Sequence, residues 1–168
     1  MKQLLVKCFY CLLTIGLFAG CEKAAYEVVT HVNVKLTSSA FEAEQVNVTI
    51  NSVQANYTDT SWVNLATNNQ SYNLLDYQNN IDTSIARGPL PATSILKKIK
   101  IVFGVQNYIK LNGKLLPLVS SQNPVIILEV NKKLNRNIEN VVVAFNPTLS
   151  ITINENGLYQ FNPVAVIK

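Results

Sequence analysis

Residues 46–57 read Val46-Asn47-Val48-Thr49-Ile50-Asn51-Ser52-Val53-Gln54-Ala55-Asn56-Tyr57 and alternate apolar with polar side chains. Successive side chains of a β-strand point to opposite faces of a sheet, so this period of two predicts a strand with one buried face. The apolar positions run 46, 48, 50 and then 53, 55, 57, so the phase slips by one residue near Ser52. An extra residue in one strand causes such a slip, and we therefore predict a β-bulge near Ser52.

Similar patterns extend on both sides of this segment. They predict strands at 28–36, 62–65, 72–75, 99–103, 125–130 and 141–145. The last two runs are rich in β-branched residues, which favour strands, and Asn146-Pro147 ends the second of them. No stretch of the mature chain shows a sustained helical period with capping residues. The pattern therefore favours an all-β fold.

Turn sequences separate the predicted strands. Asn112-Gly113 lies between two apolar runs and predicts a tight hairpin, because both central residues of a type I′ turn need a positive φ. Asn154-Glu155-Asn156-Gly157 predicts a second turn between two short runs near the C-terminus. Residues 78–94 contain Asn, Asp, Ser, Gly and two prolines, and predict a long loop. Together these features indicate about nine or ten strands at a spacing typical of sandwiches and barrels.

We therefore predict one folded domain at residues 26–168, built as an antiparallel two-sheet sandwich. The mature chain shows no internal repeat, no low-complexity tract and no second linker. It is also too apolar for a disordered protein, since hydrophobic residues make up 48% of the complete sequence and charged residues only 14%.

The N-terminal residues have the pattern of an export signal. A short start with Lys2 and Lys7 leads into an apolar run at residues 8–18. This run is too short to span a bilayer, which needs about 20 apolar residues. Two small residues, Ala19 and Gly20, then precede a cysteine.

This arrangement resembles the lipobox of bacterial lipoproteins, in which the cysteine thiol accepts diacylglycerol before the signal peptide is removed. The resemblance implies a signal peptide at 1–20, cleavage after Gly20, lipidation of Cys21 and a short tether at 21–25. Two or three acyl chains on one cysteine suffice for stable membrane attachment. The other two cysteines lie inside the signal peptide, so no disulfide is expected within the mature chain.

Charge argues against a nucleic-acid partner. The complete chain has a formal charge of +4, but the mature part holds 12 basic and 10 acidic residues. Nucleic-acid-binding domains carry a basic stripe instead. Lys97, Lys98 and Lys100 are the nearest candidates, and they interleave with Ile99 and Ile101, which indicates the solvated face of a strand.

Candidate catalytic and metal-binding residues are few. His31 is the only histidine, and the alternation places it on the solvent face of its strand. Glu42 and Glu44 are expected to share one solvated face. Triads and zinc sites need a histidine or thiolate with placed partners, so we predict no catalytic site, no metal site and no cofactor.

Two further sets of residues are candidate ligand sites. Asp76, Asn79, Asn80 and Asp82 offer oxygen ligands for calcium, although an ordinary Asx-rich loop is favoured because Asn and Asp are common turn residues. The aromatic residues nearest to loops are Trp62, Tyr57, Tyr72, Tyr77 and Tyr108. Exposed aromatic rings form sugar-stacking platforms, but aromatic residues in strands more often belong to the core, and we assign Trp62 to the core.

Several short segments share the order of landmarks found in one known family. They are Val46-Asn47-Val48-Thr49-Ile50-Asn51-Ser52-Val53, Ser61-Trp62-Val63-Asn64-Leu65, Tyr72-Asn73-Leu74-Leu75-Asp76, Leu90-Pro91-Ala92, Lys98-Ile99-Lys100-Ile101, Asn112-Gly113-Lys114 with Leu116-Pro117, and Gly157-Leu158-Tyr159 with Asn162-Pro163-Val164. In these segments the chain resembles the bacterial lipoprotein family catalogued as domain of unknown function 4382. The resemblance implies an exported β-sandwich of the transthyretin-like or immunoglobulin-like kind, and it brings no assigned activity.

The chain departs from this family at two places. Thr93 stands where the family usually has glycine, and Ala144-Phe145-Asn146 stands where it tends to have Asp-Phe-Asp. If the two acids hold an ion or ligand in relatives, this chain does not do so in the same way.

The sequence thus predicts a membrane-anchored lipoprotein of the bacterial cell envelope, in the outer membrane and facing the periplasm or the surface. Its domain is expected to be a non-catalytic binding or structural module, with loops 77–94 and 119–124 carrying any recognition of a glycan or protein ligand. An adhesin or fimbria-like subunit assembled by strand addition is the first alternative. The first arginine after Cys21 is Arg87, inside the domain, and this argues against maturation by cleavage after an early arginine. A carboxylate-dependent hydrolase is the third.

Overall fold

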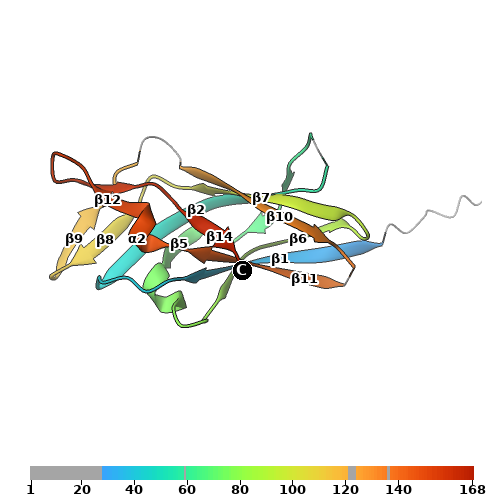
Figure 1. Ribbon diagram of the computed structural model, residues 1–168, viewed down its shortest axis with the longest axis horizontal. Coiled ribbons are helices and arrows are strands. Elements are labelled where there is room, and N and C mark those ends of the chain that lie inside the picture. The colour runs from blue at the N-terminus through green and yellow to red at the C-terminus, as the bar shows by residue number, and fades with distance from the viewer. Residues whose placement is uncertain (1–27, 59, 121–123, 136) are drawn as a thin grey trace, which may run out of the picture.

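The computed structural model describes residues 28–58, 60–120, 124–135 and 137–168. Two sheets pack against each other and enclose a shared core (Figure 1). Sheet A consists, in spatial order, of β14 (Ala165–Ile167), β11 (Ile138–Phe145), β1 (Val29–Ser38), β6 (Thr83–Pro91) and β4 (Ala66–Thr67). The predicted all-β sandwich is therefore confirmed.

Sheet B forms the second layer. Its strands, in spatial order, are β10 (Val125–Lys133), β7 (Ile95–Phe103), β2 (Gln45–Asn56), β8 (Tyr108–Leu111) and β9 (Lys114–Pro117), and β3 (Val63–Asn64) and β5 (Gln70–Asn73) also pair with β2. A separate hairpin joins β12 (Ile151–Ile153) to β13 (Tyr159–Phe161). Two single turns of helix complete the structure, η1 (Leu74–Tyr77) and α2 (Pro147–Ser150). In the part of the chain that is described, no helix has the length and apolarity needed to cross a bilayer.

Strand β2 has the alternation that its sequence predicts. Val46, Val48 and Ile50 are fully buried, and so are Val53 and Ala55 after the phase slip. The register against β7 shifts between Ile50 and Ser52, which confirms the predicted bulge. The Asn112-Gly113 hairpin between β8 and β9 is confirmed as well, because both residues have the positive φ of a type I′ turn, 48° and 75°.

Three phenylalanines join the two sheets and the β12–β13 hairpin. Phe103 of sheet B meets Phe161 of β13 edge to face at 5.4 Å between ring centroids, and meets Phe145 of sheet A at 6.0 Å. All three rings are essentially fully buried. Asn146, which follows Phe145, accepts a hydrogen bond from Leu149 N and caps α2. The central residue of the altered Ala144-Phe145-Asn146 segment is thus a core residue, and its last residue has a structural partner.

One strand pair differs from the antiparallel prediction. Strand β1 pairs with β11 in parallel register, from His31 opposite Ile138 to Ser38 opposite Phe145. The chain reaches β11 from β10, which lies in the other sheet, so no hairpin constrains the direction in which β11 enters sheet A. All other strand pairs between named strands are antiparallel.

The prediction of a long loop at 78–94 is wrong, because most of this segment is strand β6. Ile85 and Leu90 of β6 are buried, and the strand lies between β1 and β4 inside sheet A. The two prolines and the glycine that indicated a loop are all within the strand.

The register explains why the prolines are tolerated there. Ala92 N donates to Val28 O at 2.8 Å, and hydrogen bonds in an antiparallel pair alternate between the two sides of a strand. Pro89 and Pro91 therefore turn their nitrogens away from β1. On that other side β4 pairs only with Ala86 and Arg87, so neither proline removes a ladder hydrogen bond.

The turn between β6 and β7 contains a strained residue. Thr93 has a φ of 70°, in the left-handed region that disfavours β-branched side chains. Ser94 N closes the turn on Pro91 O at 3.3 Å, and Thr93 N donates to Leu134 O at 3.0 Å. A positive φ at the third residue alone is the requirement of a type II turn, which usually places glycine there. Glycine would adopt this φ at no steric cost, whereas Thr93 does so under strain.

Replacing Thr93 with glycine is expected to stabilise the domain by about 1 kcal/mol, because relief of the left-handed strain exceeds the added entropy of the unfolded chain. Urea denaturation of the wild type and the variant measures the difference. Ala92→Gly is the matched control, since Ala92 lies in the same turn without a positive φ and should lose stability instead. Equal stability of Thr93→Gly and the wild type would show that the turn is not strained.

Candidate ligand-binding face around Trp62

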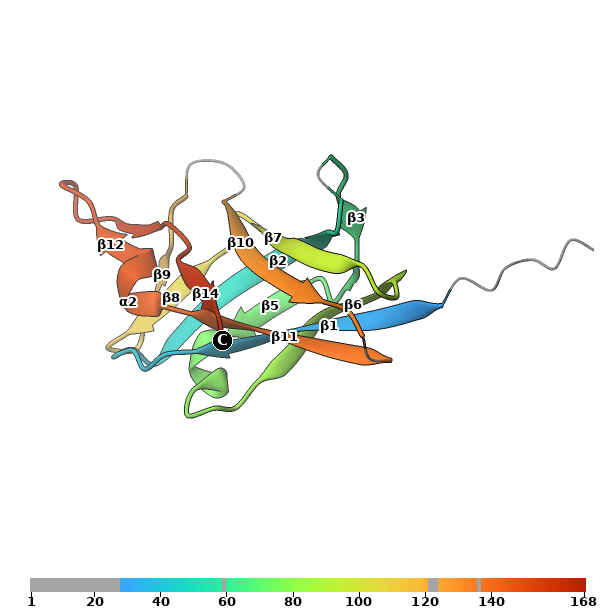
Figure 2. The same cartoon turned by 45° about the vertical axis from the view of Figure 1, so that its right-hand side comes forward.

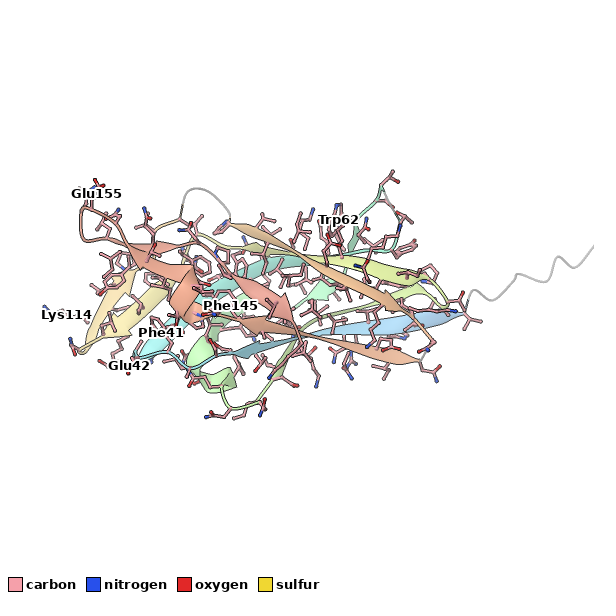
Figure 3. The ribbon with its side chains drawn as sticks, in the orientation of Figure 1. Phe41, Glu42, Trp62, Lys114, Phe145 and Glu155 are labelled. Carbon is pink, nitrogen blue, oxygen red and sulfur yellow. The ribbon has the colours of Figure 1, made fainter. Side chains whose placement is uncertain are left out.

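Trp62 lies on the outer side of sheet B, immediately before β3 (Figure 3). The short segment alternates, so that Leu65 turns into the core while Trp62 remains partly exposed. The assignment of Trp62 to the core is therefore wrong. The apolar residues Trp62, Val63 and Leu65 predict one short strand, but neighbouring residues of a strand point to opposite faces, and Trp62 lies on the outer one.

A row of cationic and amide side chains lies beside the indole. Lys100 of β7 places its Nζ 4.5 Å from the centroid of the Trp62 ring, a cation–π contact. Gln54 of β2 pairs with Lys100 on one side and with Asn64 on the other. Its Nε2 donates to Asn64 Oδ1 at 2.6 Å, whereas its Oε1 is buried and has no hydrogen-bond partner.

The next cross-strand pair on the same face, Asn56 and Lys98, lines a shallow cavity. Asn56 pairs with Lys98, and Lys98 binds Glu129 of β10 at 2.7 Å. The cavity has a volume of about 270 Å³. Its lining consists of Asn56, Trp62, Lys97, Lys98 and Ile127. This face thus combines one aromatic ring, one exposed aliphatic side chain, three nearby lysines and amide groups.

The other aromatic candidates do not join this face. Tyr72 is 1% exposed, its hydroxyl donates to Asn68 O, and burial raises the pKa of its phenol. Tyr77 packs edge-on against Tyr72, and Tyr57 packs against the core. Tyr108 is exposed, but it lies on β8 in the other half of sheet B.

The Asp and Asn side chains of the segment at 76–82 contact different residues of the fold and do not converge on one ligand site. Asp76 accepts from Asn73 Nδ2 at 2.9 Å, and Asp82 binds Lys35 at 2.9 Å. Asn80 accepts from Lys168 and, like Asn79, has a positive φ, as expected of a turn residue. Within the described residues, no three His, Cys, Asp or Glu side chains come together as a metal-binding group.

The remaining titratable residues considered as catalytic or metal-binding candidates do not come together in one site. His31 is exposed on β1, as predicted, between Ile138 and Pro89 of the neighbouring strands. Glu44 binds Lys110 at 3.0 Å, and the Gly113 N–H together with Lys110 lowers the pKa of the Glu44 carboxyl. Glu42 lines a different cavity with Ala40, Phe41 and Thr148 (Figure 3). The pair Glu42 and Glu44 is solvated, as predicted, and the two acids do not face one substrate space.

The fold and this face define a class of protein, an all-β sandwich with an open surface on one sheet and no deep cleft at Trp62. Residues 29–163 match the family described as "Domain of unknown function (DUF4382)", and the chain belongs to this family. No curated protein and no solved structure matches the chain. The predicted cleavage site at Gly20, the predicted lipidation site at Cys21 and residues 121–123 of the 119–124 loop lie outside the described residues.

Proposed function

We propose that this protein is a lipid-anchored module of the bacterial cell envelope that binds an acidic glycan, without catalysis, on the face around Trp62. The observation that carries the proposal is the partly exposed indole of Trp62 beside Lys98 and Lys100 and above the shallow cavity. It needs no cofactor and no nucleic acid. The anchor is the acylated Cys21 behind the lipobox-like signal at 1–20.

The chemistry of the face fits a sugar with negative charge. The aliphatic C–H groups of a sugar ring pack on an indole, which is large, flat and rigid. Lysine ammonium groups donate to carboxylate or sulfate oxygens in charge-assisted hydrogen bonds. Lys98 is paired with Glu129, whereas Lys100 contacts the indole ring of Trp62.

Titration with an acidic oligosaccharide is expected to shift the fluorescence of Trp62, the only tryptophan in the chain. Trp62→Ala should weaken binding at least about tenfold, corresponding to about 1.4 kcal/mol. Binding of each variant is measured by calorimetry or on a glycan array, because the variant has lost its fluorophore. Tyr108→Ala is the matched control, since it removes another exposed aromatic ring of sheet B away from the cavity.

Two results would contradict this assignment. One is unchanged affinity of the Trp62→Ala variant, and the other is an equal loss in Tyr108→Ala. Preference for neutral over acidic sugars would keep the site but remove the role of the lysines.

Strand addition to form an envelope polymer is the second candidate. Among the described residues, β10 is a nine-residue strand with β7 as its one ladder partner, and its Val125 and Ile127 are exposed. However, a register break near Asn131 and the charged Lys132 and Lys133 interrupt its open edge, and such features hinder edge pairing. A ladder of oligomers on unboiled gels would place this function ahead of glycan binding.

A further inference from the structure

The end of the sandwich where β1 begins gathers four segments that are far apart in sequence. Ala92 N donates to Val28 O, Thr93 N donates to Leu134 O and Leu134 N donates to Ser94 O, each at 2.8 to 3.0 Å. Ile95 pairs with Lys133, and Ile138 pairs with His31. The start of β1, the β6–β7 turn, the β10–β11 turn and the start of β11 therefore form one surface (Figures 1 and 2). We call this surface, Val28, Val29, Thr93, Ile95, Lys133 and Ile138, the proximal end.

The proximal end exposes aliphatic side chains. Val28 is 72% exposed, Ile95 48% and Ile138 53%. Leu134, by contrast, is fully buried beneath the turn and holds the surface together. Single exposed aliphatic residues are ordinary on protein surfaces, but three at one end next to lysines combine the apolar area and the positive charge on which binding to an anionic lipid interface depends.

Among the described residues, lysines outnumber carboxylates at this end. Lys132 and Lys133 lie on the end of β10 that reaches it. Of the described carboxylates, Glu139 is paired with Lys132 at 2.9 Å and is 3% exposed. Two lysines thus stand against one acid, and this acid is buried.

The chain itself brings this end to the membrane. Residues 21 to 28 link the proposed acylated Cys21 to the first described residue, and seven residues span at most about 25 Å when fully extended. Val28 therefore lies within about this distance of the proposed anchor. The β8–β9 hairpin with Lys114 and the β12–β13 turn with Glu155 lie at the opposite end (Figure 3).

We propose that the proximal end docks on an anionic phospholipid surface, with lysines on the phosphates and with Val28, Ile95 and Ile138 entering the interface. This inference rests on the proposed lipid anchor at Cys21. Docking orients the sandwich, so that the β8–β9 hairpin points away from the bilayer and the Trp62 face stays on its flank.

An environment-sensitive fluorophore tests the docking. The lipidated protein carrying Ile95→Cys has one free thiol, since Cys21 is acylated and Cys8 and Cys11 leave with the signal peptide. In vesicles of phosphatidylglycerol and phosphatidylethanolamine, a label at position 95 should shift to the blue and brighten about twofold. The effect should vanish in vesicles of phosphatidylcholine alone and at about 1 M salt, where the Debye length is about 3 Å. Leu115→Cys, 59% exposed at the opposite end, is the control and should not respond.

Flotation of the same vesicles separates the two proposals. If the protein floats and the label at 95 reports water in every lipid, docking is wrong and the anchor stands. An equal response at 95 and 115 also overturns docking. If the protein does not float, the anchor fails and this inference fails with it.

Discussion

Substitution of Asn107 by leucine is expected to lower the free energy of unfolding by about 2–6 kcal/mol, because it leaves the part-buried Thr49 N–H and the buried Gly104 carbonyl without their partner. Asn107 is 1% exposed and lies between β7 and β8. Its Oδ1 accepts from Thr49 N at 2.8 Å, and its Nδ2 donates to Gly104 O at 2.7 Å. For a domain of ordinary stability, about 5–15 kcal/mol, this loss is a large fraction of the total.

The reason is that Asn107 replaces part of the sheet ladder. Strand β7 pairs with β2 from Ile50 onward and β8 pairs with it only up to Asn47, so β2 has no neighbouring strand at Thr49 on this side. Gly104 N donates to Thr49 O at 2.8 Å, and the Asn107 amide supplies the matching acceptor for Thr49 N. One side chain thus bridges the gap where the chain passes from β7 to β8.

Asn107→Asp provides a pH-dependent version of the same test. The aspartate keeps the acceptor for Thr49 N–H, but its second oxygen faces the Gly104 carbonyl oxygen where an N–H group stood. Burial and this repulsion raise the pKa of the new carboxyl in the folded state above its unfolded value of about 3.9. Stability of the variant should therefore fall as the pH rises from the unfolded pKa through the folded pKa, with the full penalty at neutral pH.

Urea denaturation at pH 7 and at pH 4 measures both variants against the wild type. Asn69→Leu is the matched control, since Asn69 is exposed and its substitution should change stability by no more than about 0.5 kcal/mol. A change of this small size in Asn107→Leu would show that the two hydrogen bonds contribute nothing, and the account of the β7–β8 gap would be wrong.

Substitution of Cys21 by alanine is expected to abolish lipid attachment completely, because alanine lacks the thiol that accepts the diacylglycerol. Palmitate labelling of cells that express the protein should fall to background, and the chain should leave the membrane fraction or remain as uncleaved precursor. The effect is all or none, since stable anchoring takes two acyl chains and alanine carries none.

Cys11→Ala is the control for this experiment. Cys11 lies within the apolar run at 8–18 and is removed with the signal peptide, so its substitution should leave labelling unchanged. Labelling that persists in Cys21→Ala, or that is lost in Cys11→Ala, would refute the proposed anchor and the membrane address that follows from it.

Much of the candidate ligand-binding face is formed by residues that are neighbours in space but far apart in sequence. The lysines at 97, 98 and 100 were predicted to be the solvated face of a strand, and Lys98 and Lys100 do lie on the outside of sheet B. The contact of Lys100 with Trp62 was not predictable, because β3 joins β2 by a pairing that the local sequence does not encode. The structural role of Asn107 was not predictable either, because an asparagine beside a predicted strand is ordinarily interpreted as a turn residue when its buried partners are unknown.

Features that depend on near neighbours along the chain could be predicted from the amino-acid sequence. The period of two in β2, the bulge at Ser52 and the Asn112-Gly113 turn follow from side-chain direction and backbone sterics within a few residues. Features that depend on distant partners became apparent from the fold. Strand β6 forms despite Pro89 and Pro91 because the side of the strand that they face has no ladder at these two positions. The chain enters β11 from the other sheet, so no hairpin imposes an antiparallel direction on β11 beside β1. Such pairings join residues that are far apart in sequence, and local propensity carries no information about them.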